Sequence, residues 1–133
     1  GVLVEPVLDL IDIDYGAWQG LYTETVLSQW PAEAGQWYEA PHFARIPGGE
    51  TLQAVLARVA RVFNDTIDRH PEKTCVLVAH DSINRIGLMH VLDIPLARYW
   101  HLRQDPCCIN EIEYLDGAYR LDRMNDTGHL GKV

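Results

Sequence analysis

The chain has 133 residues, of which 47% are apolar and 23% charged, so it is long enough to form one domain around a hydrophobic core. Its formal net charge of −8 argues against general binding to nucleic acid or to an acidic membrane, because both would repel it. No apolar run approaches the ~20 residues of a transmembrane helix. Three cysteines, two of them adjacent, do not make a disulfide framework and favour a reducing, cytoplasmic location.

The first 20 residues predict a strand followed by a shaped loop. Residues 2–8 are apolar apart from Glu5 and Pro6, which is typical of a short edge strand. Residues 12–20 hold two glycines with Trp18 between them, and this pattern indicates a loop rather than a regular element.

The next 30 residues predict one helix and a long connection. A helix over 22–30 ends where Pro31 follows Trp30, because the residue before a proline disfavours helical geometry. Residues 31–49 carry three prolines and a glycine pair, with only a brief helical stretch at 32–38. Aromatic-rich connections of this length often cover a functional site.

A long amphipathic helix is predicted next. Thr51 can cap its N-terminus, and His70-Pro71 ends it. The apolar side chains that recur at helical spacing are Leu52, Val55, Leu56, Val59, Val62, Phe63 and Ile67.

The centre of the chain predicts a strand that ends at a histidine. Residues 75–79 are apolar without alternation, which indicates a strand buried on both faces. His80 follows, and Ser82 can cap a helix that runs to about residue 92. Pro95 then opens a short helix or turn to about residue 99.

The C-terminal region predicts a β-hairpin. Residues 108–115 alternate apolar and polar side chains, Asp116-Gly117 is typical of a type I′ turn, and 118–123 return as the second strand. Residues 124–133 have no clear pattern. The whole chain, 1–133, therefore reads as a single α/β domain without repeats or linkers.

His80 is the leading functional candidate because of its position. A side chain at the carboxyl end of a parallel strand, facing a helix N-terminus, lies where open α/β sheets bind ligands and especially anions. Ser82 and Arg85 lie close by in sequence and are candidate phosphate ligands. An imidazole can attack phosphorus or, when protonated, stabilise the phosphoryl oxygens. The alternative is a structural histidine hydrogen-bonded beneath a loop.

Three acids compete for the role of proton donor to a leaving group. Asp81 follows His80 directly and is either a general acid or a helix-capping carboxylate. Asp12 and Asp14 precede the glycine loop, where spacing alone favours ordinary loop acids. A carboxyl group beside the phosphate would protonate the leaving alkoxide.

Other chemistries lack support in the sequence. There is no Gly-x-Ser-x-Gly elbow and no Gly-x-x-x-x-Gly-Lys-Ser/Thr loop. No histidine or cysteine pair has zinc spacing, and Cys107-Cys108 is expected in the core. We expect neither a metal nor a cofactor.

Four segments, in order along the whole chain, resemble the histidine phosphatase superfamily, the phosphoglycerate-mutase-like proteins of branch one. Residues 10–20 (Leu-Ile-Asp-Ile-Asp-Tyr-Gly-Ala-Trp-Gln-Gly) resemble the family's Leu-x-Glu-x-x-x-Gly-x-Trp-x-Gly segment. Residues 47–51 (Pro-Gly-Gly-Glu-Thr) resemble its Pro-Gly-Gly-Glu-Ser, and 76–80 (Val-Leu-Val-Ala-His) its second histidine motif. Residues 125–130 (Asn-Asp-Thr-Gly-His-Leu) resemble the C-terminal end of many members.

The resemblance implies a three-layer α/β/α fold with a mixed sheet, and it implies roles for particular residues. His80 matches the second histidine of the phosphate pocket, Asp12 the glutamate proton donor, and Tyr15 an aromatic position near the substrate. Arg85 matches a recurrent arginine. Asp81 departs from the mutase-like branch, which has glycine there, and resembles the phytase branch, in which this aspartate is the donor. We favour Asp12 because the surrounding sequence resembles the mutase-like branch.

One part of the family pattern is absent from these 133 residues. No Arg-His-Gly, the signature whose histidine becomes phosphorylated, occurs anywhere in them. We therefore expect an N-terminally truncated, incomplete domain in which loss of inner strands exposes unpaired backbone, or a homodimer that repairs the sheet.

Three functional hypotheses follow. By family the chain is a phosphomonoester hydrolase, here inactive because the nucleophilic histidine is absent. The alternatives are a non-catalytic remnant that binds a phosphorylated ligand or a protein, and a phosphoglycerate mutase if the full-length chain is intact. The expected partner is a phosphorylated small molecule, and we expect no nucleic acid and no membrane.

Overall fold

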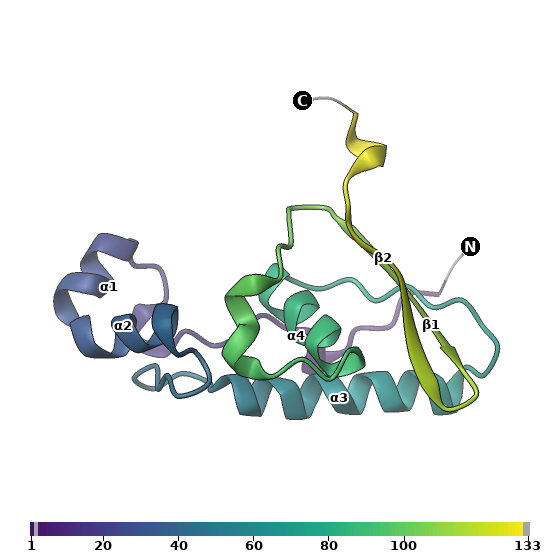
Figure 1. Ribbon diagram of the computed structural model, residues 1–133, viewed down its shortest axis with the longest axis horizontal. Helices are drawn as coiled ribbons and strands as arrows, with labels where there is room; N and C mark the ends of the chain where they lie inside the picture. The colour runs from purple at the N-terminus through teal and green to yellow at the C-terminus, as the bar shows by residue number, and fades with distance from the viewer. Residues whose placement is uncertain (2, 132–133) are drawn as a thin grey trace.

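The computed structural model describes residues 1 and 3–131, in which α4 lies over the long helix α3, α1 and α2 lie to one side, and a β-hairpin lies at the other end (Figure 1). The α-helices and strands are α1 (Thr23–Gln29), α2 (Pro31–Glu39), α3 (Leu52–Arg69), α4 (Asp81–Val91), β1 (Ile109–Leu115) and β2 (Ala118–Asp126). Short 3₁₀ turns are η1 (Leu8–Leu10), η2 (Gly16–Trp18), η3 (Leu96–His101) and η4 (Gly128–Leu130). The predicted helices over 22–30 and 51–70 are confirmed, and the brief stretch at 32–38 is a full helix.

Helix α3 is the longest element and forms the base of the molecule (Figure 1). The Thr51 side chain accepts a hydrogen bond from the Ala54 amide at 3.2 Å, which satisfies one of the free N–H groups at the helix start. Val55 and Val59 are completely buried on the face that contacts α4. The predicted cap and apolar face are both confirmed.

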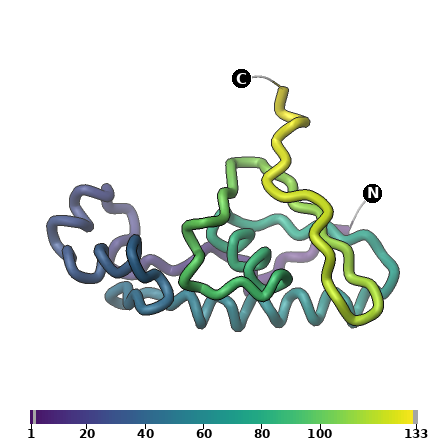
Figure 2. The backbone as a smooth tube through the Cα atoms, viewed as in Figure 1, coloured from purple at the N-terminus to yellow at the C-terminus, as the bar shows by residue number. Residues whose placement is uncertain are grey.

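Helix α4 packs on α3 and completes the core (Figure 2). Ile83, Ile86 and Met89 are buried at this contact. Gly87 allows a close approach, because a Cβ there would lie 3.2 Å from the Phe63 ring. The two helices therefore bury their apolar faces against each other, whereas in other α/β domains helices bury such faces against a sheet.

The C-terminal hairpin is the one sheet in the described part of the chain. Strands β1 and β2 pair antiparallel, with Tyr114 opposite Tyr119. Asp116 and Gly117 both have positive φ, at 52° and 81°, as a type I′ turn requires. The predicted hairpin is confirmed, and β2 extends to Asp126, into the tail in which no sequence pattern is visible.

The predicted strand over 75–79 is wrong in this structure. The segment is extended, but no backbone hydrogen bond joins residues 74–79 to another described residue. Val76 and Val78 are each 82% exposed, whereas Leu77 is 38% exposed and Ala79 packs against the core. A strand needs a neighbour to pair with, and β1 and β2 pair only with each other within the described residues. One face of this segment is therefore open.

The short helix or turn predicted after Pro95 is confirmed as the 3₁₀ turn η3, which continues to His101. Two smaller predictions need correction. Residues 3–8 form no strand, ending instead in the 3₁₀ turn η1, and Val2 lies outside the described residues. Cys107 is exposed rather than buried, because the chain turns there with a positive φ of 58°.

Two backbone hydrogen bonds hold the loop at residues 14–17 against the loop at residues 47–50. The Ala17 amide donates to the Pro47 carbonyl at 2.8 Å, and the Glu50 amide donates to the Asp14 carbonyl at 2.8 Å. Gly16 has a positive φ of 47°, and a Cβ on it would lie 2.4 Å from the Pro47 carbonyl oxygen. Only glycine fits at this crossing.

We predict that Gly16→Ala destabilises the fold by about 2 kcal/mol or more, because both the left-handed backbone and the backbone clash oppose it. Gly35→Ala is the matched control, since Gly35 lies within α2 with open space around it. That change is expected to be neutral or to stabilise by up to about 1 kcal/mol. Urea unfolding of both variants measures the difference, and equal stabilities would contradict the role of the loop crossing.

Candidate functional site

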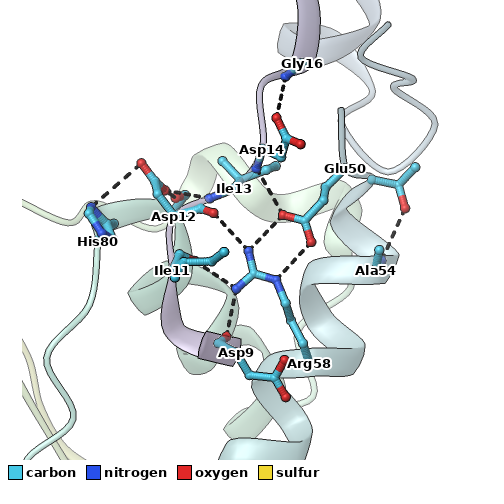
Figure 3. Close-up of polar contacts among 12 residues, drawn as sticks. Asp9, Ile11, Asp12, Ile13, Asp14, Gly16, Glu50, Ala54, Arg58 and His80 are labelled. Atoms are coloured by element: carbon cyan, nitrogen blue, oxygen red, sulfur yellow. Dashed lines mark hydrogen bonds and ion pairs between the residues drawn. The ribbon is translucent and has the colours of Figure 1, made fainter. Parts of the chain in front are cut away.

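A buried arginine organises the loop that carries the predicted acids (Figure 3). Arg58, on α3, is only 7% exposed. Its guanidinium donates to the carbonyl oxygens of Asp9 at 2.7 Å, Ile11 at 2.8 Å and Asp12 at 3.1 Å. It also forms a bidentate pair with Glu50, with both N–O distances at 2.9 Å. All five N–H donors of the arginine are thus used.

Glu50 joins this arginine to the second loop. The Glu50 carboxylate accepts a hydrogen bond from the Asp14 amide at 3.0 Å in addition to the two from Arg58. Hydrogen bonding to Arg58 is the main reason that the pKa of Glu50 lies below its usual value. The Arg58–Glu50 pair therefore holds residues 9–14 in one conformation against the N-terminal half of α3.

The Asp12 side chain is oriented by contacts on both of its oxygens. Oδ1 accepts hydrogen bonds from the Ser82 hydroxyl and, at 2.8 Å, from the Ile13 amide. Oδ2 lies 3.8 Å from Nδ1 of His80, close enough for an ion pair when the imidazole is protonated. The Asp12 carboxylate and the His80 ring face each other (Figure 3), and both side chains are partly open to solvent. A reacting group could approach this pair from outside.

His80 stands at the N-terminus of α4, as the sequence predicts. It is the N-cap residue, with extended backbone, and its side chain makes no capping bond. The free amides of the first turn and the helix dipole favour an anion at this end. The predicted cap, Ser82, instead lies inside the helix and is buried, because its hydroxyl is directed to Asp12.

Arg85 is engaged mostly with the protein. Its Nε donates to the Leu102 carbonyl at 2.8 Å, and Nη2 lies 3.5 Å from the Asp81 carboxylate. The guanidinium also packs against the rings of Tyr99 and Trp100, at 4.7 and 5.2 Å from their centroids. Arg85 and Ser82 thus both have internal partners, and their direct contact with phosphate stays a prediction.

Tyr15 lies between the acidic residues and an aromatic cluster. Burial is the main reason that its pKa is raised, and the nearby carboxylates of Asp12 and Asp81 add to the effect. Burial likewise raises the pKa of Tyr99 to about 12. The Tyr15 ring makes an edge contact with Trp37 at 6.1 Å between centroids. Both phenols therefore remain protonated at neutral pH.

Two further features of the described residues bear on function. Within residues 1 and 3–131, no group of three or more His, Cys, Asp or Glu side chains is arranged to hold a metal ion. None of the helices in that part of the chain is long and apolar enough to cross a membrane.

The fold brings a histidine, two aspartates and a tyrosine to one helix N-terminus. Comparison of the sequence with known protein families shows which of them the chain belongs to. Residues 1–127 match the profile of the histidine phosphatase superfamily (branch 1). The chain belongs to this superfamily. The resemblance inferred from the four sequence segments is thereby confirmed.

Curated relatives include phosphatases and a mutase. The chain is 30% identical over 123 residues to Phosphoserine phosphatase 1 of Hydrogenobacter thermophilus, a match that covers 92% of this chain and 58% of that protein. It is 24% identical over 134 residues to the probable phosphoglycerate mutase GpmB of Cronobacter sakazakii, covering 97% of this chain and 61% of that protein. The chain thus spans about three fifths of the length of these relatives.

Solved structures confirm the predicted α/β, phosphoglycerate-mutase-like fold. YhfR of Bacillus stearothermophilus superposes with a TM-score of 0.85 at 22% identity, covering 90% of this chain and 59% of that one. The mycobacterial glucosyl-3-phosphoglycerate phosphatase Rv2419c, in complex with VO3, superposes with a TM-score of 0.83 at 25% identity, covering 96% of this chain and 65% of that one.

The structure brings most of the predicted site residues together. Asp12 contacts both His80 and Ser82, whereas the Asp81 carboxylate, in the first turn of α4, lies beside Arg85. Asp14 lies apart, because its carboxylate caps the Gly16 amide at 2.8 Å. Arg58 was not identified from the sequence, because in the helical pattern it is simply one of the polar residues between the apolar positions. The signal that could have found it is a charged residue at helical spacing between the apolar positions Val55 and Val59, preceded by an acid, Glu50, just before the helix.

We predict that Arg58→Leu destabilises the fold by about 3 kcal/mol or more, because the buried carbonyls of the 9–12 loop and the Glu50 carboxylate lose their partner. Arg61→Leu is the control, since Arg61 lies on the same helix but forms an exposed pair with Asp9. Its loss is expected to cost less than about 1 kcal/mol. Denaturant unfolding of the two variants compares them, and similar losses would show that Arg58 is an ordinary surface cation.

Proposed function

We propose that this chain carries part of the active site of a phosphomonoesterase. The observation that carries the proposal is the Asp12 carboxyl oxygen facing His80 across 3.8 Å at the N-terminus of α4. The anion-binding helix end, a histidine and an anchored acid are the groups that phosphoryl transfer from an ester needs. The phosphatase relatives, and a similar protein solved with the oxyanion VO3, support this assignment.

In the proposed reaction, His80 and the first-turn amides of α4 bind the phosphoryl oxygens. A nucleophilic histidine nitrogen forms a bond to phosphorus as the bond from phosphorus to the ester oxygen breaks. The Asp12 carboxyl gives its proton to the departing oxygen, and water then releases phosphate from the histidine. Asp81 is the alternative donor, but its carboxylate lies beside the Arg85 guanidinium and away from the Ser82 contact that anchors Asp12.

The nucleophile of this proposal lies outside these 133 residues, which contain no Arg-His-Gly. We therefore propose that residues 1–133 form one incomplete domain and that the chain alone binds an oxyanion without turning over esters. Two carboxylates lie at the site, those of Asp12 and Asp81, and they repel a bound oxyanion. Binding of the oxyanion by the chain alone should therefore be weak, with a dissociation constant of about 1 mM.

A non-catalytic role in binding a phosphorylated ligand is the second candidate for the chain alone, because these 133 residues contain no Arg-His-Gly. We further propose a cytoplasmic location, since Cys75, Cys107 and Cys108 are free thiols. The partner of the site is a phosphorylated small molecule. A phosphoglycerate mutase remains the alternative for a longer protein that contains this chain.

We predict that orthovanadate binds to the chain and that His80→Ala weakens this binding at least about tenfold, because the imidazole that faces the anion at the helix N-terminus is lost. Isothermal titration measures both affinities. His70→Ala is the control, since His70 is also an exposed histidine but lies at the C-terminus of α3 rather than at the N-terminus of α4. Rapid hydrolysis of p-nitrophenyl phosphate that His80→Ala abolishes would contradict the assignment of the nucleophile to a part of the protein outside this chain.

We also propose that residues 75–79 pair with a second copy when the chain is alone. Their extended backbone is unpaired and their valine side chains are exposed, and such a segment is a template for strand addition. Sedimentation at rising concentration should show a homodimer, and Val76→Lys with Val78→Lys should shift it to monomer. Val4→Lys, at another exposed apolar position, is the control. A wild-type chain that stays monomeric throughout the range contradicts the pairing.

A further inference from the structure

An aromatic cleft lies next to the proposed phosphate site. It has a volume of about 330 Å³ and is walled by segments of α1, α2, the 15–23 loop and η3. Five aromatic side chains line it: Tyr15, Trp18, Trp37, Tyr38 and Trp100. The volume lies near the lower end of the range of small-molecule sites, which are typically apolar with a few polar groups.

The cleft shares two walls with the residues around His80. Tyr15 lines the cleft and is close enough to Asp12 and Asp81 for their charges to act on its phenol. Trp100 lines it from the other side, and its ring packs on the Arg85 guanidinium, which in turn lies 3.5 Å from Asp81. A group attached to a phosphate held at His80 therefore has the cleft beside it.

The cleft is built as a rigid aromatic frame around Trp37. The Trp37 ring makes edge contacts with Tyr15, Trp18 and Trp100, at centroid distances of 6.1, 6.5 and 5.5 Å. The Trp100 indole N–H donates to the Trp37 carbonyl at 2.7 Å, which fixes η3 against α2. Tyr38 stacks on Trp100 at 5.7 Å and is half exposed, so a flat surface faces solvent.

The charge of the cleft distinguishes among ligands. Of the described residues that line it, none is charged, and the polar side chains are Gln19 and Thr23 together with ring N–H and phenol groups. Trp18 is 7% exposed, and its indole N–H has no hydrogen-bond partner among the described residues. Aromatic faces hold flat apolar groups well, whereas a carboxylate or ammonium would lose hydration without gaining a counter-ion.

We propose that this cleft holds the leaving group of the substrate and that the substrate is a phosphomonoester with a neutral, flat or apolar leaving group. The inference rests on the proposed function, because it places the phosphoryl group at His80. It assigns to Tyr38 and Trp100 a role in substrate specificity. Esters whose leaving group carries a carboxylate, such as phosphoserine and phosphoglycerate, fit this cleft poorly.

The test compares the binding of three anions to the chain by isothermal titration: inorganic phosphate, phosphoserine and 2-naphthyl phosphate. The naphthyl ester is expected to bind about tenfold more tightly than phosphate, and phosphoserine no more tightly than phosphate. Tyr38→Ala should remove most of the advantage of the naphthyl ester and leave phosphate binding unchanged. Tyr114→Ala is the matched control, since Tyr114 is similarly exposed but lies on β1.

The outcomes separate the two proposals. Equal affinities for the naphthyl ester and phosphate, or a naphthyl advantage that survives Tyr38→Ala, overturn the cleft assignment and leave the phosphate site intact. Binding of 2-naphthol as tight as that of its phosphate ester, unaffected by His80→Ala, overturns the proposed function instead.

Discussion

The buried pair of Arg58 and Glu50 is the interaction on which the proposed site depends. One guanidinium bonds three carbonyls of the 9–12 loop and both oxygens of Glu50, which itself bonds the Asp14 amide. These contacts join α3 to a loop without regular structure, so they replace the hydrogen bonds that a strand would receive from its neighbours. The position of Asp12 opposite His80 follows from this arrangement. Arg58 holds the backbone of Asp12, and the hydrogen bond from Ser82 orients its carboxylate.

The elements with local signals could be predicted from the sequence. The apolar period from Leu52 to Ile67, with Thr51 as a cap, determines α3 because both signals act within a few residues. Asp116-Gly117 determines the hairpin in the same way, through the positive φ that both residues adopt. His80 could be placed at a helix N-terminus from the order of the apolar run and the helix that follows it. These predictions needed no knowledge of what lies across the fold.

The features that depend on distant partners could not be predicted. Residues 75–79 have the composition of a buried strand, but pairing decides whether a strand forms, and the described residues offer this segment no partner. Ser82 fits the pattern of a helix cap in the sequence, because the carboxylate that accepts its hydrogen bond is 70 residues away. The aromatic cleft assembles side chains from four separate segments, none of which has a motif that marks the others. Composition predicts which groups need partners, and the tertiary fold determines which partners they find.

The central claim is that the Arg58–Glu50 pair holds Asp12 opposite His80 at an oxyanion site at the start of α4. A crystal structure of the chain with bound orthovanadate tests it most directly. We expect the vanadate to lie within hydrogen-bonding distance of the His80 imidazole and the first-turn amides of α4, with the Asp12 carboxyl beside it. Vanadate bound elsewhere on the chain, or a 9–14 loop that leaves Arg58 and turns Asp12 away from the ion, would contradict the account.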